Sequence, residues 1–272
     1  MTSMADSETF SWQSDLELIV DAAKQAGAVA LGFFRQSPEV WWKNGGQSPV
    51  SAADYAANDV LSSILQKARP DYGWLSEETD DASDRLERRT LFVVDPIDGT
   101  RGFLAGSEIW CISVAVVTDG RPVAGVLFAP ALRELYVAGL EGPARKNGEI
   151  LQVSKVGRGD VQRLATAEDM IAGFGPDFRR TVERVKHVPS LAYRLAMVAD
   201  GRIEGTLVKR DSHDWDLAAA DLILQQAGGQ LADLSGALLT YNKPVVKHGE
   251  LCGAATASMP EFLRQLASRR DS

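Results

Sequence analysis

The 272-residue chain is predicted to be an α/β (α+β) protein with two packed sub-domains. It opens with two amphipathic helix patterns, continues with short apolar strands joined by tight turns, and then alternates strands and helices. Its length and its 45% hydrophobic content suffice for a full core. We place an N-terminal α+β sub-domain over residues 1–150 and a C-terminal α/β sub-domain over residues 151–272.

The sequence predicts four longer helices, over residues 14–35, 51–68, 191–198 and 214–227. Ser14, with Glu17 three residues later, fits a capping box at the start of the first helix. Ser51 is the expected N-cap of the second helix. The last of the four should end at Gly228-Gly229, because glycine commonly follows the final helical residue.

Short strands are expected over residues 72–75, 91–94, 111–117, 122–128 and 134–138. A hairpin turn at 118–121 makes this sheet largely antiparallel. The turn-rich segment from Lys43 to Pro49 is expected to be a mobile loop. Trp41-Trp42 is either a core plug beside this loop or part of the face of an expected homodimer, and the sequence leaves both open.

Charge and cysteine content exclude several classes of protein. The net charge of −8 implies no general affinity for a nucleic acid polymer, so an anionic substrate would need a local device such as a metal ion. Cys111 and Cys252 lie in apolar stretches and are expected to be reduced core thiols. Without a signal-peptide pattern or a run of ~18 apolar residues, the protein is expected to be soluble and cytoplasmic, with no membrane partner.

Acidic side chains gather where the predicted elements begin or end: Asp54, Glu77, Glu78, Asp95, Asp98, Asp214 and Asp216. Carboxylates just past the ends of buried strands are well placed for a crevice site. Hard divalent cations require oxygen ligands, and Mg²⁺ retains several waters in a nearly octahedral shell. The pattern therefore favours a divalent metal site.

The run from Asp95 to Thr100 is the most informative segment. Pro96 removes a backbone donor and stiffens the turn, which leaves nearby carbonyl groups free to face a cation. Gly99 allows a sharp entry into a helical turn whose N–H groups are suited to phosphate, and Thr100 adds a hydroxyl. Alone, this Asp-x-x-Asp-Gly pattern is usually a solvated turn or a helix cap, and Asp54 and Asp216 could simply favour helix dipoles. The complete set favours the metal site.

Three motifs resemble those of the inositol monophosphatase superfamily: Ser76-Glu77-Glu78, the run from Asp95 to Thr100, and Trp215 to Ala220. The resemblance implies a layered α-β-α-β-α sandwich of the sugar-phosphatase type. It also implies a Mg²⁺-dependent phosphomonoesterase with two or three Mg²⁺ per active site, inhibited by Li⁺.

The resemblance also implies residue roles. Glu77, Asp95 and the Ile97 carbonyl would hold a first metal. Asp95, Asp98 and Asp216 would hold a second, and a third, looser Mg²⁺ would lean on Glu77. Asp54 and Thr100 match the family's pair that orients the attacking water.

The residues at 99–101 would contact the phosphate. The resulting hypothesis is in-line displacement by metal-activated water, without a phosphoenzyme.

The substrate is expected to be a small phosphate monoester. The segments 48–54, 75–78 and 241–243 resemble the 3′(2′),5′-bisphosphate nucleotidase branch. Lys209 and Arg210 stand where inositol monophosphatases carry a sugar-binding glutamate, and they could meet a second anionic group or form a solvated surface pair. Residues 101–103 and 110–113 depart from that branch. Inositol-1-monophosphatase and another sugar or histidinol phosphate phosphatase therefore stay open.

Two rival classes also stay open. The first is a regulatory binding protein on this fold, which would be free to lose metal ligands that are all present here. The second is a zinc hydrolase using His213, Asp214 and Asp216. No second histidine stands at ligand spacing, so His213 is expected to cap or pack. No phosphate-binding P-loop pattern occurs.

Overall fold

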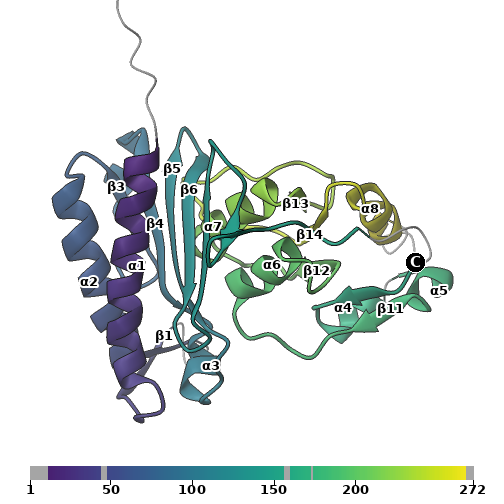
Figure 1. The fold of residues 1–272 in the computed structure, drawn as a ribbon, viewed down its shortest axis with the longest axis horizontal. Coiled ribbons are helices and arrows are strands. Elements are labelled where there is room, and N and C mark those ends of the chain that lie inside the picture. Colours follow the sequence, from purple (N-terminus) through teal and green to yellow (C-terminus); the bar gives the residue numbers. More distant parts are fainter. Residues whose placement is uncertain (1–11, 44–47, 156–159, 173, 268–272) are drawn as a thin grey trace, which may run out of the picture.

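A computed structural model of the chain describes residues 12–43, 48–155, 160–172 and 174–267. Its elements stack in five layers, helices alternating with sheets (Figure 1). The outer helix layer holds α1 (Gln13–Phe33) and α2 (Ala52–Ala68), and the central one holds α6 (Leu191–Ala199) and α7 (Asp214–Gln226). The far layer holds α4 (Glu168–Ala172), α5 (Pro176–Arg179) and α8 (Met259–Ala267). The predicted layered α-β-α-β-α sandwich is confirmed.

The larger sheet has seven strands in chain order: β3 (Gly73–Ser76), β4 (Thr90–Asp98), β5 (Cys111–Thr118), β6 (Arg121–Ala129), β7 (Glu134–Gly139), β8 (Arg145–Lys146) and β9 (Glu149–Ile150). β3 and β4 are parallel, and the other neighbours are antiparallel. This confirms the predicted strands and the hairpin at 118–121. β4 runs four residues further than expected, through Asp98. A 3₁₀ helix, η2 (Ser83–Glu87), connects β3 to β4.

The smaller sheet has five strands in the order β11-β10-β12-β14-β13. They are β11 (Val182–Arg184), β10 (Gln162–Leu164), β12 (Gly205–Val208), β14 (Leu251–Ala255) and β13 (Gly229–Asp233). The central helices α6 and α7 lie between the two sheets and contact both (Figure 1). A side chain in the first turn of either helix can therefore contact residues of the larger sheet.

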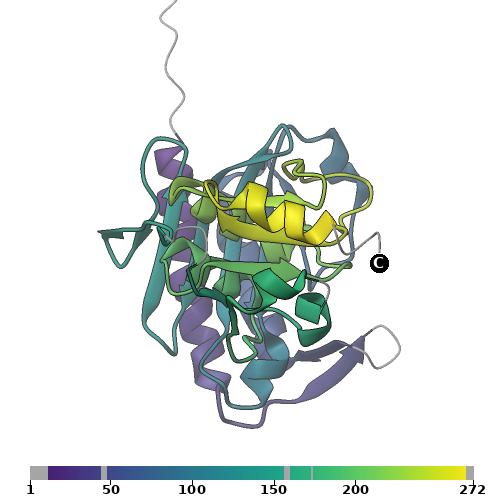
Figure 2. The same ribbon diagram turned by 90° about the vertical axis from the view of Figure 1, so that its right-hand side faces the viewer.

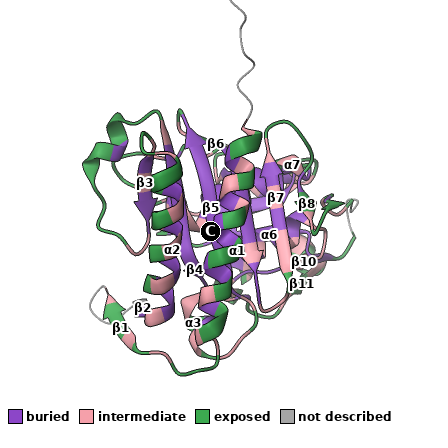
Figure 3. Ribbon diagram, turned by 60° about the vertical axis from the view of Figure 1, so that its left-hand side comes forward, coloured by how far each residue is buried: buried purple, intermediate pink, exposed green. Residues whose placement is uncertain are grey.

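Apolar side chains on both faces of the larger sheet explain why it is central. Phe92 and Val94 of β4 pack toward α1 and α2, whereas Leu91 and Val93 pack toward α6 and α7. Strands buried on both faces read as continuous apolar runs, as this one does. Figure 3 shows β4, β5 and β6 buried along most of their length, behind α1 and α2.

The first helix begins differently from the prediction. α1 starts at Gln13 with Trp12 as its N-cap, and no side-chain cap is formed, so the capping box at Ser14 was wrong. The Ser14 hydroxyl instead accepts a hydrogen bond from Arg69, which lies just past α2. At α2 the expected N-cap is confirmed: Ser51 accepts from the backbone N–H of Ala53.

The segment predicted as a loop is part of a hairpin of β1 (Val40–Lys43) and β2 (Ser48–Ser51), which projects from the body (Figure 2). Mobility was expected from Lys43 to Pro49, and residues 44–47 of that segment lie outside the described residues. Trp41 and Trp42 are 42% and 62% exposed, so the core-plug interpretation of this pair was wrong. The Trp41 ring meets the Tyr55 ring edge-on, with centroids 5.7 Å apart.

Both cysteines are buried free thiols, as predicted. Within the described ranges, no helix combines the length and apolar character needed to cross a membrane.

Candidate active site

The irregular end of β4 presents two carboxylates. Asp95 pairs with Ser113 of β5 and Asp98 with Cys111, and the ladder shifts register between them. Asp95 Oδ1 accepts a hydrogen bond of 3.0 Å from the N–H of Ile97. Asp95 and Asp98 are 1% and 5% exposed, so both acids are withdrawn from bulk water at one sheet end.

The first turn of α7 brings a third carboxylate to the same place. Each of Asp95, Asp98 and Asp216 offers an oxygen atom within 4.8 Å of the others. Asp216 is oriented by the backbone N–H of His213, which donates to its Oδ2 at 2.6 Å. Residues more than a hundred positions apart in the sequence therefore form one carboxylate cluster, at the interface of the larger sheet with the central helices.

Two glutamates follow β3 beside this cluster. Burial raises the pKa of Glu77 to about 8. The positive charge of Lys43 lowers this pKa, and the nearby acids Asp216, Glu78 and Asp54 raise it further. Lys43 reaches from the β1–β2 hairpin to Glu78, at 2.7 Å, and its Nζ lies 3.6 Å from Glu77 Oε1. Glu77 is the foremost charge acting on Asp95, so it belongs to the same electrostatic site.

Asp98 is held by the start of α6, a feature that the sequence analysis missed. Its Oδ2 accepts a hydrogen bond from the Ser190 hydroxyl and one of 2.7 Å from the N–H of Ala192, and its Oδ1 accepts one of 3.2 Å from the N–H of Leu191. Burial and Asp216 raise the pKa of Asp98 to about 7, although these hydrogen bonds favour its charged form. The Ser190 N-cap pattern before an apolar helix was the available signal.

Asp54 and Thr100 are joined by a hydrogen bond. Thr100 Oγ1 lies 3.0 Å from Asp54 Oδ1 and 3.1 Å from the carbonyl oxygen of Ile97. Ser51 fixes the other carboxylate oxygen of Asp54, donating from its N–H at 2.8 Å and from its hydroxyl at 2.6 Å. Burial raises the pKa of Asp54 despite these donors. The pair is thus a rigid hydroxyl–carboxylate unit beside Ile97.

The backbone at position 99 requires a glycine. Its φ of +98° lies in the left-handed region, and a Cβ at this position would lie 3.1 Å from the Cβ of Ser190. The short helix α3 (Thr100–Leu104) follows directly. Arg101, the second residue of this helix, is exposed.

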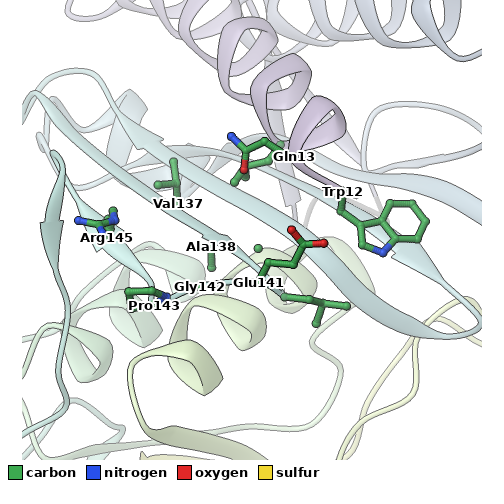
Figure 4. A pocket seen from close by; sticks show the side chains of 11 residues that line it. Trp12, Gln13, Val137, Ala138, Glu141, Gly142, Pro143 and Arg145 are labelled. Carbon is green, nitrogen blue, oxygen red and sulfur yellow. The ribbon is translucent and has the colours of Figure 1, made fainter. Parts of the chain in front are cut away.

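Lys209 and Arg210 line a cleft of about 450 Å³ that Asp98 and Asp216 also line. Lys209 is exposed and forms an ion pair with Asp169 at 2.7 Å. The same cleft includes Arg194 and Ser212, which the sequence analysis did not select. A second cleft, of about 420 Å³, lies between the first turn of α1 and the β7–β8 connection and contains none of the predicted site residues (Figure 4).

The zinc-hydrolase alternative does not fit the three histidines of the chain. His213 stacks flat on Trp215 with ring centroids 4.6 Å apart, as expected for a packing residue. His248 binds Asp214 at 2.7 Å, and His187 lines the cleft of Lys209. The acidic cluster contains carboxylates alone.

The donor set fits a hard divalent cation. Burial and the neighbouring acids, foremost Glu77 and then Asp98, raise the pKa of Asp95 well above its ordinary value. Acidic groups packed this closely repel one another when ionised, and a divalent cation would relieve that repulsion. An all-oxygen set of this kind suits Mg²⁺, Ca²⁺ or Mn²⁺ rather than a thiolate-seeking metal.

Comparison with known proteins assigns the chain to one family. The model of the inositol monophosphatase family matches residues 11–270. The inositol-1-monophosphatase of Mesorhizobium japonicum is 34% identical over 238 residues, covering 81% of this chain and 86% of that protein. The histidinol-phosphatase of Chlorobaculum parvum is 31% identical over 229 residues, covering 82% and 86%. The solved IMPase structure from Thermotoga maritima superposes with a TM-score of 0.81 at 25% identity, covering 95% and 98%.

Proposed function

Since the chain belongs to the inositol monophosphatase family, we propose that it is a Mg²⁺-dependent phosphomonoesterase acting on a small phosphate ester. The observation that carries this proposal is the carboxylate cluster of Asp95, Asp98 and Asp216. Isolated acids at element ends would have no reason to converge. A cluster assembled from two distant parts of the chain is costly unless a cation binds there.

The proposed metal ligands follow from these positions. Asp95, with Glu77 and the carbonyl of Ile97, would hold one Mg²⁺, and Asp95, Asp98 and Asp216 would hold another. A third, looser ion would lean on Glu77. Bound Mg²⁺ would neutralise phosphoryl oxygens, lower the pKa of a water molecule and stabilise the leaving oxygen.

The chain's own groups would move the proton. Thr100 Oγ1 already donates toward Asp54, so it has a lone pair to accept a hydrogen bond from an attacking water. Asp54 would then take the proton, directly or through Thr100. Its raised pKa makes it a stronger base than an ordinary aspartate. Ser51 keeps the carboxylate from rotating away.

The phosphate would lie against the turn at residues 99–101. Gly99 has no side chain to block that approach, and Thr100 provides its hydroxyl in the same turn. The exposed Arg101 is the candidate cation at the rim. Displacement would then be in line, without a phosphoenzyme.

For the substrate we lean to a 3′(2′),5′-bisphosphate nucleotide such as 3′-phosphoadenosine 5′-phosphate. The cationic cleft beside Asp98 and Asp216 supports this choice. Inositol 1-phosphate and histidinol phosphate are the alternatives, supported by the names of the relatives in Mesorhizobium japonicum and Chlorobaculum parvum. Lys209 is a weaker candidate for substrate contact than its position suggests, because Asp169 already neutralises it.

The test is release of inorganic phosphate from 3′-phosphoadenosine 5′-phosphate and from inositol 1-phosphate, with Mg²⁺ and with excess chelator. We expect Mg²⁺-dependent turnover that chelation abolishes. A regulatory binding protein would release no phosphate from either compound, whether Mg²⁺ or chelator is present. Trapping a phospho-aspartate or phospho-threonine would contradict direct attack by water.

Two further proposals concern the cellular location and the oligomeric state of the protein. The buried, unpaired Cys111 and Cys252 support a cytoplasmic location. The exposed Trp41 and Trp42 support a homodimer that covers the β1–β2 hairpin. Sedimentation of the purified protein, compared with a Trp42→Ser variant, tests the dimer.

A further inference from the structure

Arg85 lies at the centre of a buried hydrogen-bond network that the proposed mechanism does not use. It belongs to η2, in the connection that follows Glu77 and Glu78, and its side chain is 2% exposed. Its Nε and Nη2 donate to the carboxylate of Asp81, in the same connection, at 2.5 and 2.8 Å. A buried charge is unfavourable unless it is paired and hydrogen-bonded, so the other donors of this guanidinium group also require partners.

Those partners lie in a distant part of the chain. Nη1 donates to the side-chain oxygen of Asn242 at 2.7 Å, and Nη1 and Nη2 both donate to the carbonyl oxygen of Lys243 at 3.1 Å. Asn242 Nδ2 donates in return to the carbonyl oxygen of Arg85 at 3.2 Å. The guanidinium group, which carries five N–H donors, thus forms five hydrogen bonds. The connection after β3 is therefore firmly attached to Asn242 and Lys243.

Asn242 also contacts the helix that carries Asp216. Its backbone N–H donates to Asp214 Oδ2 at 2.7 Å. Asp214 is the first residue of α7 and is 1% exposed, and its Oδ1 lies 2.7 Å from His248 Nε2. Asn242 therefore touches the connection after β3 through its side chain and the first turn of α7 through its backbone.

Arg85, Asn242 and Asp214 together form a bridge between two segments of the candidate active site. The segment at one end begins with Glu77, directly after β3, and the segment at the other end contains Asp216. These two acids are close enough for the charge of Asp216 to raise the pKa of Glu77. They repel each other when both are ionised, and they stand on different elements. Their spacing therefore depends on contacts that join those elements, and the Arg85 bridge is such a contact.

We propose that Arg85 and Asn242 are positioning residues that set the spacing of Glu77 and Asp216 and so prepare the carboxylate cluster for Mg²⁺. Groups that orient metal ligands commonly contribute about 10- to 100-fold to metal affinity. The inference rests on the Mg²⁺ site of the proposed function, and it gives a role to a side chain that the mechanism leaves without one.

Asn242→Gly tests the bridge with little disturbance of the backbone. Asn242 has a φ of +59°, which glycine adopts readily, and the substitution keeps the N–H that donates to Asp214. It removes the amide that meets Arg85. Calorimetric titration should show Mg²⁺ affinity about 10-fold weaker than in the wild type. Half-saturating Mg²⁺ in the phosphate-release assay should rise by the same factor, whereas kcat at saturating Mg²⁺ should be nearly unchanged, because bound ions then hold the carboxylates themselves.

Asn147→Gly is the matched control. Asn147 also has a positive φ, +49°, and lies in the turn between β8 and β9. Its side chain also forms two hydrogen bonds, accepting from the N–H of Leu135 at 2.8 Å and donating to the carbonyl of Arg133 at 3.1 Å. None of these partners belongs to the candidate active site. This variant should keep the wild-type Mg²⁺ affinity, whatever happens to its unfolding midpoint.

Arg85→Met removes the other side of the same contact. It leaves Asp81 in water, since that side chain is 42% exposed. Combined with Asn242→Gly, it should weaken Mg²⁺ binding by less than the product of the two single effects, because both substitutions break one bridge. Should Arg85→Met fail to fold, Arg85→Lys, which keeps a charge for Asp81, takes its place.

The outcomes separate this role from a structural one and from the proposed function. Unchanged Mg²⁺ affinity in Asn242→Gly, together with a lower unfolding midpoint, would overturn the proposal and leave the bridge a purely structural feature. Equal losses of affinity in Asn242→Gly and Asn147→Gly would overturn it as well. Weaker Mg²⁺ binding in Asn242→Gly, with no phosphate release even by the wild type, would support the positioning role and refute the phosphatase function.

Discussion

Replacing Asp95 with asparagine should stabilise the metal-free protein at high pH while abolishing turnover. Two unit charges 4.8 Å apart repel by about 3.5 kcal/mol at an effective dielectric constant of about 20. Asp95 faces Asp98 and Asp216 within that distance, and an asparagine oxygen still accepts the N–H of Ile97. We therefore expect Asp95→Asn to gain about 2–4 kcal/mol of unfolding free energy where the cluster is ionised.

The pH dependence gives this prediction its sign. The pKa of Glu77 is raised to about 8 and that of Asp98 to about 7, so the folded protein holds protons that the unfolded chain has released. Stability of the metal-free wild type should fall as pH rises from about 4.5 to about 8. The gain from Asp95→Asn should therefore be near zero at about pH 5 and largest at about pH 9.

Urea denaturation in excess chelator measures both free energies. Adding Mg²⁺ should stabilise the wild type and leave the variant unchanged, because binding to the folded state alone adds stability. Asp216→Asn should also abolish turnover and keep the fold. The reasoning fails if Asp95→Asn destabilises the protein equally at both pH values.

Three further outcomes are expected. Thr100→Ala and Asp54→Asn should each lower kcat by roughly 100-fold or more in a Mg²⁺-dependent phosphate assay, because they interrupt proton transfer; a change below threefold would exclude that role. Li⁺ should inhibit turnover of the wild type, and insensitivity to Li⁺ would contradict the second metal site. Raising the Mg²⁺ concentration should not restore activity to an Asp216→Asn variant. Arg69→Met should cost about 3 kcal/mol or more of stability, since it leaves Asp15, which is 1% exposed, without its ion pair; thermal unfolding measures this, and an unchanged midpoint would refute it.

The layers and the carboxylate cluster could be predicted from sequence because their signals are local. The apolar run of β4 and the carboxylates that follow it lie in one short segment, and the N-cap at Ser51 stands directly before its helix. The hairpin at residues 118–121 carries its own turn residues, and Asp119 and Gly120 have the positive φ angles that such turns require.

Features that depend on tertiary contacts could not be predicted in the same way. Ser190 and Arg194 lie in an ordinary helical pattern, and only the packing of α6 against the end of β4 brings Ser190 to Asp98. Lys209 looked like a substrate contact until its partner Asp169, forty residues away, was placed beside it. The capping box at Ser14 failed because the helix begins at Gln13, which places Ser14 inside the first turn, where its hydroxyl accepts a hydrogen bond from Arg69.

The most direct test of the central claim is a titration of Mg²⁺ into the wild type, Asp95→Asn and Asp216→Asn, with phosphate release from 3′-phosphoadenosine 5′-phosphate and inositol 1-phosphate measured on the same samples. The account predicts that the wild type binds Mg²⁺ and releases phosphate, and that both variants lose tight binding and turnover together. Mg²⁺-dependent release at the wild-type rate by Asp216→Asn would contradict a single site assembled from both parts of the chain.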